Sequence, residues 1–251
     1  ERLFELWLGA NQTTMLPGGP LPMFGRLIQG QDHLTTQTGL KRLLSKALPD
    51  GAMVEDASIR LAIVVTDAET GRREVLRQGP LQPAVLASSA IPGLFPPVRI
   101  GSRRFVDGGL AANCDIEAAI ESGATDLMVV DLMGDGQPTA TYSVAAVIER
   151  SIGIVMRRQT DLAATAFGNR ARIAVLRADI ATRPHPWDFS QTRFLYERGR
   201  QAADDFLGKH YRANRSVKPG LFRFETGQGL DAQDGRAAGP RAASEDLLPV
   251  R

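Results

Sequence analysis

The stretch of sequence that decides the fold is FVDGGLAAN, residues 105–113. A short apolar run ends there on Asp107, and Gly108 and Gly109 follow at once. A buried strand that stops on aspartate places a carboxylate at its end, where open α/β sheets build their sites. Two glycines allow a sharp turn and leave room beside the carboxylate. Because Asp-Gly is also a common hairpin turn, this stretch alone leaves a turn and a site equally open.

The segment upstream adds a second pattern. Residues 87–98 read ASSAIPGLFPPV and lead into the strand that ends at Asp107. Together the two segments resemble the C-terminal half of a patatin-like phospholipase domain, in which ASxAxPxxFxP precedes an Asp-Gly-Gly or Asp-Gly-Ala motif. The resemblance implies a three-layer α/β/α sandwich. It also implies that Asp107 is the proton acceptor of a Ser-Asp dyad, with Gly108 and Gly109 as the motif glycines.

The same resemblance implies residues that are not found in this sequence. In that family the nucleophile lies in a Gly-x-Ser-x-Gly elbow and the oxyanion hole in a glycine-rich loop, both earlier in the chain. Neither pattern occurs in the 251 residues, which begin at Glu1. We therefore expect an N-terminally incomplete chain that carries half of the dyad and is inactive alone. Ser88 and Ser89 have a motif-like setting, but they lack the flanking glycines of a nucleophile elbow.

The composition is ordinary for a globular protein that buries a sizeable core, with 43% hydrophobic and 23% charged residues. The formal net charge of +2 argues against a nucleic-acid-binding protein. Cys114 is the one cysteine, which excludes an intrachain disulfide and fits a reducing compartment. We interpret it as a buried, inert thiol. No His/Cys cluster has the spacing of a metal site, so neither a metal nor another cofactor is expected.

Alternating helix and strand patterns predict an α/β chain. Residues 11–37 predict a long loop with at most one turn, which either covers a substrate or simply connects two elements. Residues 212–251 have the composition of a disordered tail, so a patatin-like domain would span residues 1–211. The expected helices are 1–8, 39–48 with Thr38 as N-cap, 81–90, 116–122, 142–167 and one capped by Ser190 that ends near 207. The expected strands are 59–66, 72–77, 98–100, 104–106, 126–131 and 172–176.

Two further carboxylates follow expected strands. Asp67 opens the turn DAETG, and an Asx-type turn is favoured over a catalytic role for it. Asp131 ends an apolar run, where a capping or turn role is favoured.

The function that the resemblance implies is hydrolysis of lipid acyl esters without a metal. The implied partners are a lipid acyl ester substrate and, transiently, a membrane surface. A cytoplasmic and a peripheral-membrane location both stay open. The alternative is a non-catalytic patatin-like module that binds lipid or protein, and the absence of the nucleophile pattern is its support.

Overall fold

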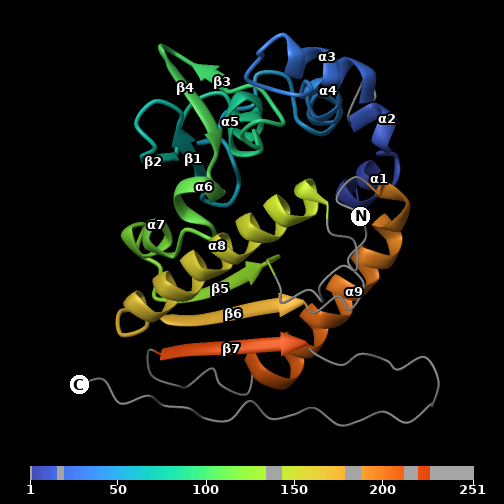
Figure 1. Ribbon diagram of the computed structural model, residues 1–251. Coiled ribbons are helices and arrows are strands. Elements are labelled where there is room, and N and C mark those ends of the chain that lie inside the picture. The colour runs from blue at the N-terminus through green and yellow to red at the C-terminus, as the bar shows by residue number, and fades with distance from the viewer. Residues whose placement is uncertain (1, 16–19, 134–142, 179–187, 212–219, 227–251) are drawn as a thin grey trace, which may run out of the picture.

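The structure is a computed structural model that describes residues 2–15, 20–133, 143–178, 188–211 and 220–226 (Figure 1). Within these ranges the strands form two sheets and helices pack on both, so the chain is α/β as predicted. The helices are α1 (Arg2–Leu8), α2 (Gln12–Met15), α3 (Pro20–Ile28), α4 (Thr38–Ala47), α5 (Leu81–Ser88), α6 (Gly109–Ala112), α7 (Ile116–Glu121), α8 (Val144–Phe167) and α9 (Thr192–Asp205). The short helices η1 (Phe189–Gln191) and η2 (Phe206–Tyr211) flank α9.

The first sheet is antiparallel and has the strand order β2-β1-β4-β3. Its strands are β1 (Ile63–Asp67), β2 (Arg73–Leu76), β3 (Val98–Ile100) and β4 (Arg103–Asp107). Helix α5 packs on this sheet and brings Ala84 and Ala87 against Val65 and Phe105 in one buried cluster. The small side chains on α5 let the helix approach the sheet closely. The first strand begins at Ile63 and not at residue 59 as expected, because Ile59 is 83% exposed and has no core to join.

The second sheet is parallel and has the order β5-β6-β7. Its strands are β5 (Asp126–Asp131), β6 (Arg172–Ala178) and β7 (Gly220–Thr226). Helices α7 and α8 cover one face, where Ile116 and Ala164 join Val129, Ile173 and Val175 in a buried cluster. Phe206, which follows α9, packs on the other face against Ala174 and Leu176. Helices therefore lie on both faces of this sheet, and α8 runs between the two sheets (Figure 1).

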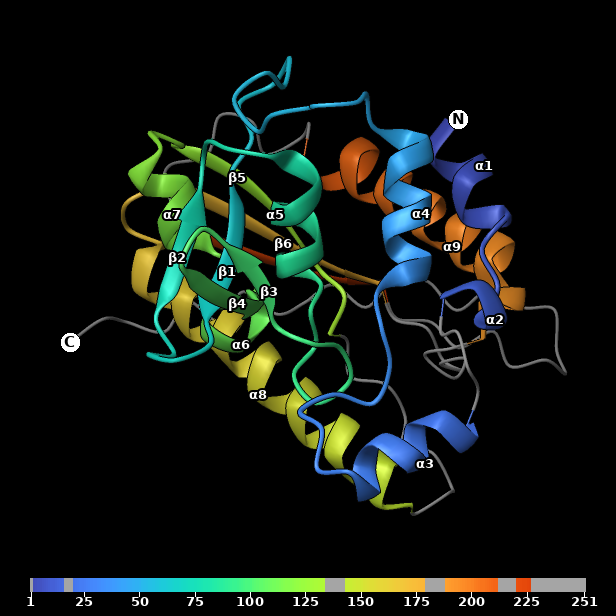
Figure 2. The same cartoon turned by 90° about the horizontal axis from the view of Figure 1, so that it is seen from above.

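The N-terminal region differs from its prediction. In place of one long loop, the structure has helices α2 and α3. The sequence of α3, PLPMFGRLI, carries two prolines and a glycine that conceal its helical spacing. Its prolines lie in the first turn, where the missing N–H costs no helical hydrogen bond. Figure 2 shows α4 between α5 and α1; this helix begins after Gln37, and Thr38 is its first residue and not its N-cap.

The C-terminal region also corrects two expectations. Residues 220–226 fall in the predicted disordered tail, yet they form β7 and pair in parallel with β6. An unpaired β6 edge offers backbone hydrogen bonds that composition alone does not reveal. Asp188, and not Ser190, caps the helical segment that precedes α9, because its carboxylate accepts the Ser190 N–H at 3.0 Å. The rest of the predicted tail lies outside the described residues.

Candidate active site

Asp107 is the last residue of β4, and α6 begins two residues later. The strand therefore does end on the carboxylate, as the sequence predicts. However, β4 runs antiparallel to both of its neighbours, with Asp107 opposite Val65 of β1. The site is consequently a strand-to-helix junction inside an antiparallel sheet, and not the carboxyl edge of a parallel one.

The carboxylate of Asp107 is half-buried, and one hydrogen bond orients it. Its Oδ1 accepts the N–H of Gly109 at 2.8 Å. Burial raises the pKa of Asp107 above its ordinary value of 3.8, and the Gly109 hydrogen bond opposes that rise only in part. A carboxylate with a raised pKa accepts a proton more readily than one in water. The environment thus suits a general base.

The two glycines after Asp107 are required by close packing and not by an unusual backbone conformation. Gly108 has φ −63°, which any residue can adopt. A Cβ at this position would lie 2.2 Å from the carbonyl oxygen of Val64, a distance that no side chain tolerates. A Cβ on Gly109 would lie 3.0 Å from Cε of Met156 and 3.1 Å from Oδ1 of Asp107. The glycines therefore let the turn lie directly on β1 and α8.

The upstream segment lies beside Asp107. The N–H of Asp107 donates to the carbonyl oxygen of Ala90 at 3.0 Å. Ser88 and Ser89 end helix α5, and the Ser89 hydroxyl donates to the carbonyl oxygen of Val85 at 2.9 Å. In the part of the chain that the structure describes, no serine hydroxyl is hydrogen-bonded to the Asp107 carboxylate. The structure thus joins the two motif segments without pairing Asp107 with a serine.

A hollow of about 420 Å³ opens next to Asp107 and is lined mainly by small and apolar side chains. Both serines at the end of α5 reach it. The lining residues are Ala62, Ile63, Val64, Val85, Ser88, Ser89, Asp107, Gly108, Gly109, Ala112, Asn113, Cys114 and Asp115. A hollow lined mainly by small and apolar side chains, with the Asp107 carboxylate at it, is a suitable place for the acyl group of an ester.

Three polar residues that the sequence did not single out hold the segment after Asp107 against α8. The Asn113 side chain donates to Oγ1 of Thr160 at 3.0 Å, and the Asn113 N–H donates to Oε1 of Gln159 at 3.1 Å. The Gln159 side chain donates in turn to the carbonyl oxygen of Leu110 at 3.2 Å. The only local sign of this contact in the sequence is that Gln159 and Thr160 are polar residues within the apolar pattern of α8. Their partners lie more than 40 residues away in the chain, so the sequence does not indicate the pairing.

The other strand-end carboxylates have structural roles. Asp67 makes the predicted Asx turn, because its Oδ1 accepts the N–H groups of Glu69 at 3.0 Å and Thr70 at 2.8 Å. The Thr70 hydrogen bonds lower the pKa of Asp67 to about 2, so this group stays ionised. Asp131 is 1% exposed, and its Oδ2 accepts the Arg177 Nε–H at 2.9 Å. Neither carboxylate is therefore available as a base.

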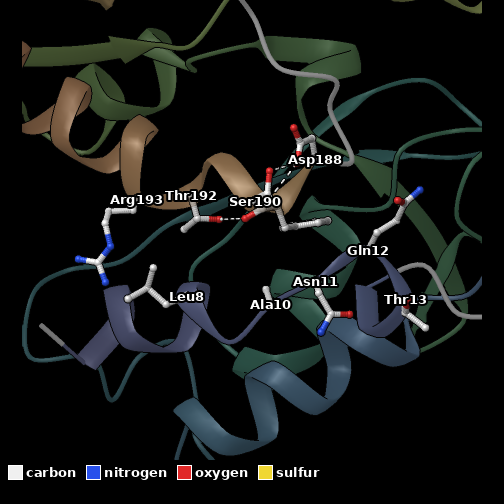
Figure 3. A pocket seen from close by; sticks show the side chains of 10 residues that line it. Leu8, Ala10, Asn11, Gln12, Thr13, Asp188, Ser190, Thr192 and Arg193 are labelled. Carbon is white, nitrogen blue, oxygen red and sulfur yellow. Dashed lines mark hydrogen bonds between the residues drawn. The ribbon is translucent and has the colours of Figure 1, made fainter.

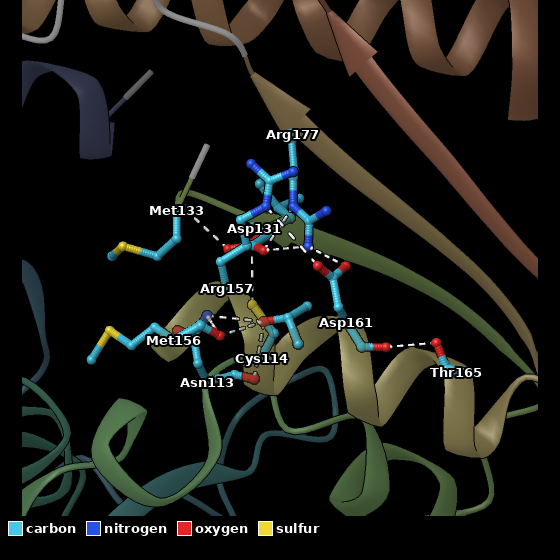
Figure 4. A network of polar contacts seen from close by, with 11 residues as sticks. Asn113, Cys114, Asp131, Met133, Met156, Arg157, Asp161, Thr165 and Arg177 are labelled. Atoms are coloured by element: carbon cyan, nitrogen blue, oxygen red, sulfur yellow. Dashed lines mark hydrogen bonds and ion pairs between the residues drawn. The ribbon is translucent and has the colours of Figure 1, made fainter. Parts of the chain in front are cut away.

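Figure 4 shows the buried polar network around Asp131. Arg177 extends from β6 and also contacts Oδ1 of Asp161 on α8 at 2.9 Å. Cys114 lies nearby with its Sγ 3.7 Å from the carbonyl oxygen of Val130. Burial raises the pKa of the Cys114 thiol, which supports the interpretation of an inert thiol, although the residue is only half-buried. The network ties the parallel sheet to α8 through Arg177 and Asp161.

A second, larger hollow of about 670 Å³ lies elsewhere, between the α1–α2 connection and the start of α9 (Figure 3). It is an open depression whose polar groups include Asn11, Asp188, Ser190 and Arg193. None of the predicted site residues lines it, so the hollow beside Asp107 is the better candidate site.

Two further statements concern only the residues that the structure describes. No group of three or more His, Cys, Asp and Glu side chains there is arranged to hold a metal ion. Helices as long and apolar as a bilayer crossing needs are also absent from those residues.

Comparisons with known proteins agree with the geometry. Residues 3–120, which include Asp107 and both glycines, match the family model named patatin-like phospholipase. Two similar curated proteins, from Mycobacterium bovis and Mycobacterium tuberculosis, each bear the name uncharacterized NTE family protein. Each is 28% identical over an alignment of 179 residues that covers 64% of this chain and 29% of the relative. The chain thus spans less than a third of these relatives. Residues 3–120, which hold this motif geometry, thus match a patatin-like phospholipase domain.

Proposed function

We propose that this protein hydrolyses lipid acyl esters with a Ser-Asp dyad in which Asp107 is the general base. The match of residues 3–120 to the patatin-like phospholipase model supports a lipid hydrolase at the family level. The observation that carries the finer proposal is the Asp107 carboxylate itself, half-buried at the strand-to-helix junction and facing a hollow of about 420 Å³. Among the described strand-end carboxylates Asp67, Asp107 and Asp131, Asp107 accepts the Asx-turn N–H of Gly109, whereas an arginine also contacts each of the other two.

The chemistry follows from that placement. Asp107 accepts the proton of the serine hydroxyl while the serine oxygen attacks the ester carbonyl carbon. The proton then passes to the leaving alcohol as the ester C–O bond breaks. In the second half, Asp107 takes a proton from water, the water oxygen attacks the acyl-serine, and the proton returns to the serine oxygen as the free acid leaves. A lipid ester substrate would present its carbonyl at the hollow, with the protein in transient contact with the lipid surface.

Labelling with a fluorophosphonate probe tests the nucleophile. The 251 residues contain no Gly-x-Ser-x-Gly sequence, so we expect the intact protein from its natural source to carry the label on a serine outside them. The measurement is mass analysis of the labelled peptides, with heat-denatured protein as the control. Label on Ser88 or Ser89 would overturn the assignment of the nucleophile.

An unlabelled but folded protein would instead favour the second candidate, a non-catalytic module that binds lipid or protein. Two observations favour that alternative. The sequence has no elbow pattern, and no described serine is hydrogen-bonded to Asp107.

The pH dependence of hydrolysis tests the base. Asp107 acts only when ionised, so kcat/KM should rise with pH as its carboxyl group loses its proton. Because burial raises the pKa of that group, we expect the midpoint of the rise above 3.8. The assay requires that activity lost at low pH return on readjustment, which excludes unfolding. A reversible midpoint at or below 3.8 would contradict the role of Asp107.

A further inference from the structure

The side chain of Thr66 contacts both sides of the Asp107 turn. Thr66 lies in β1 opposite Val106 and is 1% exposed. Its hydroxyl donates to the carbonyl oxygen of Asp107 at 2.8 Å and accepts the N–H of Ala111 at 3.2 Å. The first contact holds the end of β4, and the second holds the first turn of α6. One buried hydroxyl therefore closes the loop from the strand to the helix.

The same strand fixes the turn at a second point. The carbonyl oxygen of Val64 is the atom that excludes any side chain from position 108. Gly108 also lies between the two residues that Thr66 contacts, Asp107 and Ala111. The backbone of the turn thus packs closely against β1 at Val64 and is hydrogen-bonded to β1 at Thr66. The Asp107 carboxylate has one further restraint, the N–H of Gly109, which belongs to the same turn.

We propose that Thr66 is a positioning residue for the Asp107 base. The inference rests on the proposed function and adds a residue to it. A valine at this position would fill the same space and suit a β-strand equally well. It would form no hydrogen bond to the Asp107 carbonyl oxygen or to the Ala111 N–H, so the hydroxyl is the part of the side chain that is needed. Loss of the hydroxyl frees the turn, and the carboxylate shifts relative to the reacting oxygen. Misplacement of a catalytic group by about 1 Å can cost on the order of 100-fold in rate.

The test compares Thr66→Val with Thr66→Ser in the intact protein, with a short-chain lipid ester as substrate. We expect T66V to lower kcat about 10- to 100-fold with KM changed by less than about threefold. T66S keeps the hydroxyl and should retain most of kcat. Thr35→Val is the matched control, because Thr35 is also fully buried and is outside the candidate site. T35V should lower Tm as T66V does and leave kcat unchanged.

A double variant separates positioning from stability. If Thr66 acts through Asp107, then T66V added to Asp107→Asn should not lower the residual hydrolysis further. An equal loss in both backgrounds would overturn the inference, and so would a T66V enzyme with the kcat of the parent. Failure of the proposed function is distinguishable, because in that case D107N itself keeps full activity. Near-parent activity of T66V with an inactive D107N would reject the role of Thr66 alone.

Discussion

Replacing Asp107 by asparagine is expected to lower kcat for lipid ester hydrolysis by about 10²- to 10⁴-fold, the range for loss of a general base. The asparagine Oδ1 can still accept the Gly109 N–H that orients the side chain at 2.8 Å, so the turn keeps its shape. What is lost is basicity. Kinetics of the intact protein at neutral pH provide the measurement.

The stability of the same variant has an expected sign. The pKa of Asp107 is raised in the folded protein, so the folded state binds this proton more tightly than the unfolded chain does. The ionised carboxylate therefore disfavours folding as pH rises past 3.8, and an uncharged amide removes that cost. We expect Tm of D107N at neutral pH to equal or exceed that of the parent. An inactive but destabilised D107N would point to a structural role.

Asp67→Asn is the matched control, because Asp67 also ends a strand of the first sheet. Hydrogen bonds from Thr70 lower its pKa to about 2, so its ionised form stabilises the fold above 3.8 and that contribution is lost as pH falls towards 2. D67N should lower Tm at neutral pH and leave kcat near that of the parent. A D107N enzyme with parental turnover would remove Asp107 from the mechanism.

Replacing Arg177 by methionine is expected to lower the free energy of unfolding by about 3–5 kcal/mol. Arg177 is 3% exposed and contacts the carboxylates of Asp131 and Asp161, each at 2.9 Å. Without the guanidinium, Asp131 remains buried at 1% exposure beside an apolar side chain. Burial of a charge without its counter-ion is among the most destabilising of single changes. Denaturant unfolding, followed by circular dichroism, measures the loss.

Two variants serve as controls for Arg177. Arg200→Met removes an arginine that also contacts two carboxylates, Glu197 and Asp204, but on the exposed face of α9. Water solvates these groups, so the unfolding free energy should change little. Asp131→Leu added to Arg177→Met should recover part of the loss, because it removes the stranded charge. A single R177M variant as stable as R200M would show that the buried network contributes nothing.

The sequence predicted the parts of the site that are local in the chain. The apolar run, Asp107 and the two glycines are contiguous, and the structure places them at a strand end as expected. Helix α8 was predicted almost to the residue because its apolar periodicity is long. The direction of β4 relative to its neighbours was not predictable, since strand pairing depends on contacts outside the pattern. The catalytic role of Asp107 and the domain boundary at residue 211 stay predictions.

The missed features share a physical cause. Thr66 and Asp107 are 41 residues apart, and Asn113 and Thr160 are 47 apart, so no local pattern marks either pair. Helix α3 was concealed by its prolines and glycine, which outweigh its apolar spacing in any local propensity. Strand β7 holds Leu221, Phe222 and Phe224, but the polar composition of residues 212–251 as a whole predicted a tail, and the pairing with β6 defines the strand.

The attachment of the Asp107 turn to α8 has a mechanical consequence. Thr66 hydrogen-bonds the turn to the antiparallel sheet. A few residues later, Asn113 is hydrogen-bonded to α8, and α8 packs on the parallel sheet. Any movement of one sheet relative to the other therefore acts on the segment between these two contacts, residues 107–113. Asp107 lies at the start of that segment, so its orientation depends on the strain between the two sheets.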